Sequence, residues 1–296
     1  MHPAHKEELL QLIRNLCQPL EPHPTGYPLK MKTGTMRSVI FDVYGTLFVS
    51  AAGDVGPDSA EDDEQAFRHA LADGGWDPAL LSDKVSGVRL LRQEIAWVQE
   101  QKRQRGIEYP EINILQIWQR VLGLLQLESG EAQGLRRLAV SYECRVNPTW
   151  PGPGIKETLQ GLRERGVVLG ILSNAQFYTP LIFEALMGLS PVQLGFEPDL
   201  CLWSFQEGEG KPSPNLFPRL QARLQRQAIA GNRVIFVGND MLKDVWSAAT
   251  AGFQTALYCG DKRSLRLRQD DVRVRGLKPD LVIDDLRQLL DCINRW

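Results

Sequence analysis

Cysteine and histidine are scarce in this chain, and neither is arranged as a metal or redox site. The 296 residues include five scattered cysteines without a CxxC pair, so neither a disulfide framework nor a zinc site is expected. The four histidines stand outside every motif described below, and no GxSxG sequence is present, which argues against a Ser-His-Asp hydrolase. We therefore expect that the cysteines are reduced and that the function depends on side chains other than cysteine and histidine.

Long apolar runs and a large excess of one charge are also missing. No apolar run approaches the roughly 18 residues that indicate a membrane span, and the N-terminal MHPAHKEELL is too charged for a signal peptide. A net charge of −2 gives no reason to expect nucleic acid or an anionic membrane as a partner. With 43% apolar and 24% charged residues, the composition is that of a globular protein, and we expect a cytoplasmic location.

Alternating strand and helix patterns cover the second half of the chain. After an amphipathic helix at 5–17 and a proline-rich linker, the run VIFDV that follows Ser38 predicts a first buried strand. Further buried runs are VVLGIL, LCLW, RVIFVG, QTALY and DLVI. Helical patterns alternate with them at 155–165, 180–187, 214–227, 242–250 and 286–293. This alternation predicts an α/β fold with a Rossmann-like parallel sheet between two layers of helices.

Residues 64–144 contain no convincing strand. A small, acidic stretch at 50–62 is expected to be a loop. Helical patterns follow it at 65–72, 84–104, 112–125 and 130–144. We therefore expect three parts, an N-terminal helical extension and linker at 1–36, an α/β core at 37–49 and 150–296, and an inserted all-helical domain at 50–149.

Polar residues follow the first two strands of the core, at the sheet edge where ligands of open α/β sheets bind. Asp42 ends the first strand, and the turn Tyr44-Gly45-Thr46 behind it would expose the carboxylate as a nucleophile. An aspartate that only caps a turn is the alternative. Ser173 and Asn174 close VVLGIL and can donate hydrogen bonds to an anionic group, although this pair is also a common cap.

Lys211 lies in the loop GEGKPSP, which is not a phosphate-binding P-loop. Phe205 and Pro212 occupy the places where that motif requires glycine and a serine or threonine. Lys211 could instead neutralise a carboxylate nucleophile and a bound anion, unless it is simply a solvated loop lysine.

A fourth motif, GNDMLKD, follows the apolar strand RVIFVG. Asp240 and Asp244 are four residues apart at the first turn of a helix, so their carboxylates lie on one face. Such oxygens suit Mg²⁺, which takes one or two carboxylates together with water and phosphate. A double N-terminal cap is the alternative.

Taken in order, strand-DxYGT, strand-SN, GKP and strand-GNDxxxD resemble the four motifs of the haloacid dehalogenase superfamily. The resemblance runs from about Ser38 to the C-terminus, and the helical insertion resembles one type of cap domain of that family. It implies that Asp42 is the nucleophile and that Asp42, the Tyr44 carbonyl, Asp240 and Asp244 bind Mg²⁺. It also implies that Thr46 steadies the nucleophile loop, that Ser173 and Asn174 hold the transferring group, and that Lys211 pairs with Asp42. Asn239 could take the place of Asp240; we expect Asp240.

Tyr44 departs from the pattern of the family's phosphatases, most of which have a second aspartate there as general acid and base. Tyrosine, with an ordinary pKa of about 10, is a poor base at neutral pH, whereas the 2-haloacid dehalogenases resemble this chain in carrying tyrosine. Asp240 and Asp244 nevertheless favour Mg²⁺ and a small-molecule phosphate ester as substrate. A metal-independent 2-haloacid dehalogenase and a weakly active binding or regulatory protein remain as alternatives.

The segment from Lys262 to Arg275 carries six basic residues. Its VRVR sequence predicts a solvated loop or an edge strand, and an anion-binding or partner-binding patch is the alternative.

Overall fold

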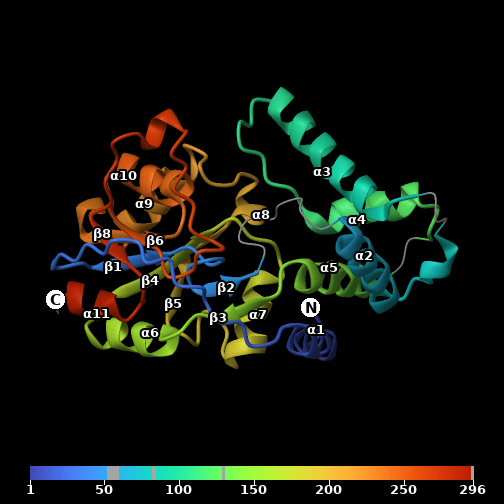
Figure 1. Ribbon diagram of the computed structural model, residues 1–296, viewed down its shortest axis with the longest axis horizontal. Coiled ribbons are helices and arrows are strands. Elements are labelled where there is room, and N and C mark those ends of the chain that lie inside the picture. Colours follow the sequence, from blue (N-terminus) through green and yellow to red (C-terminus); the bar gives the residue numbers. More distant parts are fainter. Residues whose placement is uncertain (52–59, 82–84, 129–130, 295–296) are drawn as a thin grey trace.

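The centre of the molecule is a six-stranded parallel sheet with the strand order β5-β4-β1-β6-β7-β8 (Figure 1). The computed structural model describes residues 1–51, 60–81, 85–128 and 131–294. The strands are β1 (Ser38–Phe41), β4 (Val168–Ser173), β5 (Phe196–Trp203), β6 (Val234–Gly238), β7 (Gln254–Tyr258) and β8 (Leu281–Ile283). The predicted α/β fold with a parallel sheet is therefore confirmed.

β1 is an inner strand of this sheet, and its sequence explains why. All four of its residues are buried, and successive side chains point to opposite faces. Val39 and Phe41 enter the apolar core on one face, whereas Ile40 enters the core on the other. Phe41 is in register with Ile171 of β4 and Val237 of β6, so the carboxyl ends of these three strands lie side by side.

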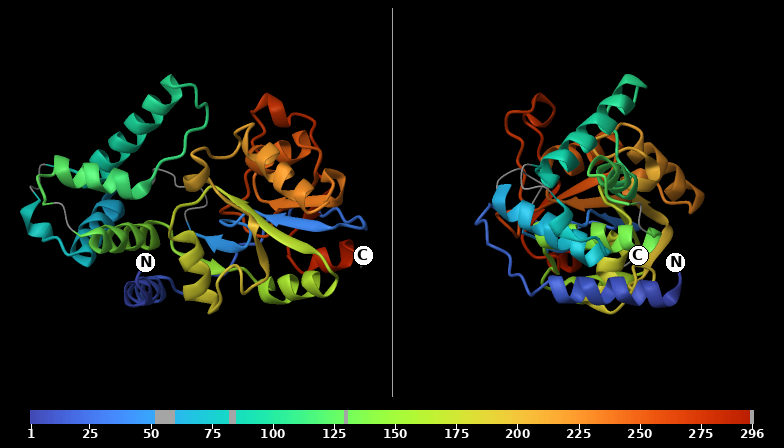
Figure 2. Two further views of the ribbon diagram at one scale, coloured as in Figure 1. Left: turned by 180° about the vertical axis from the view of Figure 1, so that it is seen from behind. Right: turned by 90° about the vertical axis from the view of Figure 1, so that its right-hand side faces the viewer.

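Helices cover both faces of the sheet (Figures 1 and 2). One face is covered by α6 (Ile155–Glu164), α7 (Thr179–Met187) and α11 (Gln288–Cys292), and α1 (Pro3–Leu16) packs against α7. The other face is covered by α9 (Leu216–Arg226) and α10 (Ser247–Thr250). A short helix, α8 (Ser204–Glu207), follows β5, and a π-helical segment, η3 (Met241–Trp246), follows β6. Three 3₁₀ turns complete these elements: η1 (Pro78–Leu80), η2 (Gly231–Arg233) and η4 (Val272–Val274).

A group of four helices, called here the helical unit, lies beside the sheet (Figure 2). It comprises α2 (Ala60–Gly74), α3 (Gly87–Gln104), α4 (Ile114–Leu124) and α5 (Ala132–Val146). It has an apolar core of its own, in which the rings of Phe67 and Trp118 lie 5.3 Å apart. The predicted helices are therefore present. Residues 52–59 of the predicted loop, and Lys84 and Gly130 at the starts of two predicted helices, lie outside the described residues.

Two short strands at the connections to the helical unit were not predicted. β2 (Phe48–Ser50) pairs antiparallel with β3 (Thr149–Pro151), so the chain leaves and re-enters the core at adjacent points. Three residues are too few to show a strand periodicity, and the prolines around 148–153 argue against a strand at the second position.

The N-terminal segment joins the two parts of the structure. α1 packs against both α5 and α7, and Lys6 forms an ion pair of 2.6 Å with Glu184 of α7. The linker after α1 is irregular, as predicted, and Lys30 pairs with Val282 on the edge strand β8. All five cysteines are free, which confirms the expectation of no disulfide framework. Among the described helices, none combines the length and the apolar character that crossing a membrane requires.

Candidate active site

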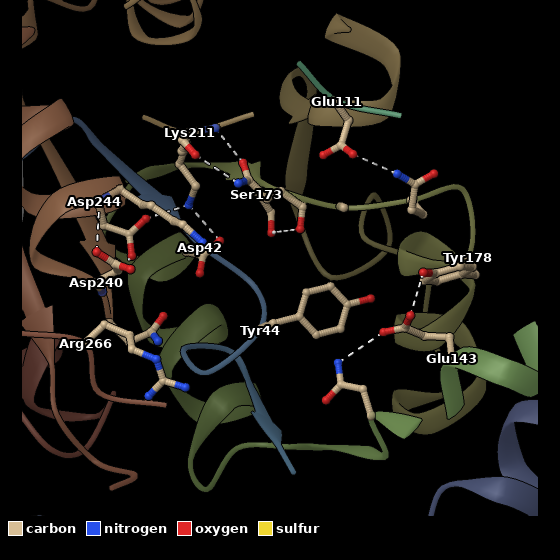
Figure 3. Close-up of a pocket in the computed structure, with 16 residues that line it drawn as sticks. Asp42, Tyr44, Glu111, Glu143, Ser173, Tyr178, Lys211, Asp240, Asp244 and Arg266 are labelled. Atoms are coloured by element: carbon tan, nitrogen blue, oxygen red, sulfur yellow. Dashed lines mark hydrogen bonds and ion pairs between the residues drawn. The ribbon is translucent and has the colours of Figure 1, made fainter. Parts of the chain in front are cut away.

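A pocket of about 420 Å³ lies at the carboxyl ends of the strands, between the core and the helical unit (Figure 3). The residues that line it from the core are Asp42, Tyr44, Ser173, Asn174, Ala175, Gln176, Tyr178, Lys211, Asn239, Asp240, Lys243, Asp244 and Arg266, and those from the helical unit and its connections are Glu111, Glu143 and Asn147. All four motifs therefore meet in one place.

The loop that follows Asp42 is hydrogen-bonded to the loop after β6. Gly45 has a φ of +79°, and a Cβ atom there would lie 2.6 Å from the Cβ of Ser264 and 2.7 Å from Nδ2 of Asn239, so only glycine fits. The hydroxyl of Thr46 donates a 3.1 Å hydrogen bond to Oδ1 of Asn239. Thr46 thus lies behind the pocket, in the position from which it can steady the loop that carries Asp42.

Lys211 connects two carboxylates at the centre of the site. Its Nζ lies 2.8 Å from Oδ1 of Asp42 and 2.6 Å from Oδ1 of Asp244, and the residue is only 4% exposed. Burial alone would lower the pKa of Lys211, but the carboxylates of Asp244 and Asp42 outweigh it and raise the pKa, so the ammonium group stays charged. Oδ2 of Asp42 has no hydrogen bond to any described residue, which leaves it available to attack a substrate.

Asp244 is poised to titrate near neutral pH. Burial raises its pKa, Lys211 lowers it, and the charges of Asp42 and Asp240 raise it, with a net pKa of about 7. Oδ2 of Asp244 also accepts a 2.9 Å hydrogen bond from the main-chain N–H of Asp240. A positive charge added beside these carboxylates would favour their ionised forms.

Asn174 has partners that differ from the predicted ones. Its Nδ2 donates to the carbonyl of Lys211 (3.1 Å), and the N–H of Lys211 donates to its Oδ1 (2.6 Å). With both ends of its amide bound to the main chain of Lys211, Asn174 is arranged to position this lysine. The hydroxyl of Ser173 lines the pocket and makes only a long, 3.5 Å contact to the carbonyl of Asn174, so it remains available to donate.

Replacing Asn174 by alanine is expected to lower kcat by roughly tenfold and the free energy of unfolding by about 1–3 kcal/mol, because two hydrogen bonds to the Lys211 loop are lost. KM should change little if Asn174 does not touch the substrate. Steady-state kinetics and chemical denaturation measure these effects, with Asn232→Ala at an exposed position as control. A large rise in KM without a change in kcat would instead support the original substrate-binding role.

Both carboxylate oxygens of Asp240 already accept hydrogen bonds from other residues. Its Oδ1 accepts hydrogen bonds from the N–H groups of Leu242 (2.8 Å) and Lys243 (3.0 Å), as an N-cap. Its Oδ2 accepts from Nε (3.0 Å) and Nη2 (2.6 Å) of Arg268. Over the described residues, no set of three acidic, histidine or cysteine side chains is arranged around one metal position. These partners count against Asp240 as a metal ligand, because each of its oxygens already accepts two hydrogen bonds. Oδ1 of the alternative, Asn239, accepts one hydrogen bond, from Thr46.

Tyr44 is not arranged as a proton carrier. Its hydroxyl lies 2.8 Å from Oγ1 of Thr179, and burial, reinforced by the charge of Glu143, raises the pKa of Tyr44 well above its ordinary value. The expectation that a tyrosine here is a poor base is thus strengthened.

The side of the pocket opposite Asp240 carries two glutamates that the sequence reasoning missed. Glu143 of α5 accepts hydrogen bonds from Tyr178 (2.7 Å) and from Nδ2 of Asn147 (3.1 Å), and burial raises its pKa. Glu111 accepts from Ser204 (2.6 Å) and Gln176 (3.2 Å), and burial raises its pKa also. Each glutamate looks like an ordinary surface residue in the sequence, and only the docking of the helical unit brings it to the pocket.

The basic segment after β7 contributes to the site as well. Of the two predicted forms of VRVR, a solvated loop or an edge strand, the structure shows the loop, in which Val272–Val274 form the turn η4. Arg268 binds Asp240, and Arg266 lines the pocket, so part of this segment faces the site rather than solvent. The alternation of basic residues with Leu265 and Leu267 in LRLR was the available signal, since both leucines pack inward.

Comparison with known proteins points to a family of hydrolases. The family model of haloacid dehalogenase-like hydrolases matches residues 36–252. The chain is 30% identical over 142 residues to a ribulose-1,5-bisphosphate 5-phosphatase of Halopiger xanaduensis, covering 48% of this chain and 56% of that protein. It is 27% identical over 162 residues to a phosphoglycolate phosphatase of Pseudomonas savastanoi, covering 53% of each. The matches thus span about half the length of these curated relatives.

Solved structures of both chemical types share the fold. A 2-haloacid dehalogenase from Pseudomonas syringae is 21% identical, with a TM-score of 0.56 over 87% of this chain and 98% of that one. A phosphatase from Thermococcus onnurineus is 18% identical, with a TM-score of 0.50 over 88% of this chain and 100% of that one. Identities this low establish a common architecture, whereas the chemistry has to be argued from the side chains.

Proposed function

This chain belongs to the haloacid dehalogenase-like hydrolases, and we propose that it is a magnesium-dependent phosphatase of small phosphomonoesters with Asp42 as its nucleophile. The observation that carries the proposal is the buried Lys211, which holds one oxygen of Asp42 and leaves the other free at the pocket. Names of relatives support the choice of phosphate, since two of them are described as phosphatases.

The proposed reaction proceeds in two displacements. Oδ2 of Asp42 attacks the phosphorus atom, and the ester oxygen leaves as an alkoxide or phenolate that takes a proton from water. A second water molecule then hydrolyses the aspartyl phosphate, which releases inorganic phosphate and restores the Asp42 carboxylate. Ser173 would donate to an oxygen of the phosphoryl group, and the charge of Lys211 would offset the charge that builds up on it. Because Tyr44 cannot supply a proton, esters with good leaving groups are expected to react faster than alkyl esters.

The pocket offers hard oxygen ligands that fit a magnesium ion. Oδ1 of Asp42 accepts one hydrogen bond, from Lys211, and keeps a lone pair for a cation while Oδ2 attacks. The carbonyl of Tyr44 accepts no main-chain hydrogen bond from the described residues, and Asp244 lies beside Lys211. We propose these three groups, together with Asn239 in preference to Asp240, as the ligands. When bound, Mg²⁺ would supply positive charge to the phosphoryl oxygens and to the carboxylates around them.

The helical unit, which corresponds to the inserted domain predicted at 50–149, is proposed to serve as the cap over this site. β2 and β3 form the paired connection to the core, and α5 delivers Glu143 to the pocket wall. The pocket volume of about 420 Å³ and its polar lining suit a small, polar substrate.

Chelation of Mg²⁺ is expected to abolish phosphate release, and Mg²⁺ binding should strengthen with pH. Asp244 must ionise to bind the cation, so below its pKa of about 7 the apparent affinity should fall by about tenfold per pH unit and should level off above it. Calorimetric titration of Mg²⁺ between about pH 6 and about pH 8 measures this dependence. An affinity that does not change over this interval would remove Asp244 from the ligand set.

A metal-independent 2-haloacid dehalogenase is the second candidate. It is favoured by Tyr44 and by the ion pair between Asp240 and Arg268, which neutralises one carboxylate of the site without a metal. A screen of phosphate esters and 2-haloacids, each with Mg²⁺ and with chelator, separates the two reactions. Halide release in chelator, without phosphate release from any ester, would replace the phosphatase proposal.

A further inference from the structure

Arg266 is the one arginine among the residues that line the pocket, and its charge is not matched by a carboxylate. Its Nη1 donates to the carbonyls of Arg263 (2.7 Å) and Leu265 (3.2 Å), and no described carboxylate lies within ion-pair range. Nε and Nη2 make no hydrogen bond to a described residue. Arg268, two residues away, has its guanidinium on Asp240 instead.

The carboxyl groups that line the pocket all have partners of their own. Asp42 and Asp244 share Lys211, and Asp240 pairs with Arg268. Glu111 and Glu143 have raised pKa values and hydrogen bonds to neighbouring residues. Among the described residues, the guanidinium of Arg266 therefore faces the pocket as a cation without a counter-ion.

The main chain holds Arg266 firmly beside the motif loops. Its N–H donates to the carbonyl of Asn239 (3.0 Å), and its carbonyl accepts from the N–H of Met241 (2.8 Å). Ser264, two residues before it, accepts a 2.5 Å hydrogen bond from Nδ2 of Asn239 and lies against Gly45. Figure 3 shows Arg266 beside Asp240, across the pocket from Glu143 and Tyr178. A side chain held in this way is already ordered before a ligand binds.

We propose that Arg266 binds a second anionic group of the substrate, a carboxylate or a second phosphate, in addition to the phosphoryl group that is transferred. This rests on the proposed function and makes the preferred substrate a small phosphomonoester with two anionic ends. The planar guanidinium suits either group, because its free N–H donors match two oxygens at once.

Matched substrates test the assignment. Phosphoglycolate is compared with 2-hydroxyethyl phosphate, which replaces the carboxylate by a hydroxymethyl group, and propane-1,3-diol bisphosphate is compared with 3-hydroxypropyl phosphate. For Arg266→Gln, kcat/KM should fall by about 10- to 100-fold for the preferred two-anion ester and change less than about threefold for its hydroxyl analogue. Arg275→Gln, which removes the same charge at an exposed position, should leave both unchanged.

Dissociation constants of the same four esters, measured by calorimetry on the wild type and Arg266→Gln, make the test independent of turnover. Binding that discriminates through Arg266 without any phosphate release would support the anion site and count against the proposed phosphatase. The loss of affinity for phosphoglycolate, compared with the loss for propane-1,3-diol bisphosphate, shows whether a carboxylate or a second phosphate is the preferred second group. Equal losses for two-anion esters and hydroxyl analogues, or no loss for any ester, would overturn the assignment, the former placing Arg266 on the transferred phosphoryl group.

Discussion

Replacing Asp42 by asparagine is expected to lower phosphatase turnover by at least about 10³-fold, because an amide cannot act as the nucleophile. The fold should persist, since asparagine has the same shape and Lys211 keeps its 2.6 Å contact with Asp244. Turnover is measured with an aryl phosphate and Mg²⁺, and folding by circular dichroism. Asp199→Asn, at an exposed position on β5, is the matched control and should keep full activity.

A folded Asp42→Asn protein that retains near-normal hydrolysis would show that another group attacks the substrate. Water activated elsewhere in the pocket would then be the alternative, and the contact of Lys211 with Asp42 would have only a structural purpose.

Replacing Lys211 by methionine should abolish activity and destabilise the protein by about 3–5 kcal/mol at alkaline pH, because two buried carboxylates lose their counter-ion. The loss should depend on pH. Lys211 lowers the pKa of Asp244, so its removal raises that pKa further above the value in the unfolded chain. A carboxyl group with a raised pKa favours folding while it is protonated, and this contribution is lost as pH rises through the folded-state pKa.

The destabilisation of Lys211→Met should therefore be smaller at about pH 5.5 than at about pH 8. Urea denaturation at the two pH values measures it, and Lys156→Met at an exposed position on α6 serves as control. A destabilisation that is equal at both pH values would show that the packing of the lysine stem, rather than its charge, stabilises the site.

The parts of the site that could be predicted are those at the ends of buried strands. VIFDV, VVLGIL and RVIFVG are nearly continuous apolar runs, which is typical of inner strands of a parallel sheet. Once they are placed in one sheet, Asp42, Ser173 and Asp244 must approach one another. The structure places Lys211 among them, at 2.8 Å from Asp42.

The partners of individual side chains could not be predicted in the same way. Asn174 was expected to bind the substrate, yet its amide binds the main chain of Lys211. This contact depends on the local path of the loop that carries Lys211. Asp240 was expected to bind the metal, but it pairs with Arg268, which comes from the loop between β7 and β8, one strand later. Charge pairs between segments distant in sequence leave no periodic pattern.

The wall opposite the core depends on docking between two parts of the chain. Glu143 occupies a helix position like many others, and Glu111 reaches the pocket because its N–H donates to the carbonyl of Gly208 (3.1 Å) while the N–H of Gly210 donates to the carbonyl of Tyr109 (2.9 Å). Such contacts follow from the tertiary arrangement and not from helical periodicity.

Trapping the covalent intermediate tests the central claim most directly. The protein is mixed with Mg²⁺ and an aryl phosphate, quenched in acid within one turnover, digested, and analysed by mass spectrometry. We predict one phosphoryl group on the peptide that contains Asp42, and none on the same peptide of Asp42→Asn. Phosphate release that continues without any phosphoryl group on this peptide would contradict the account.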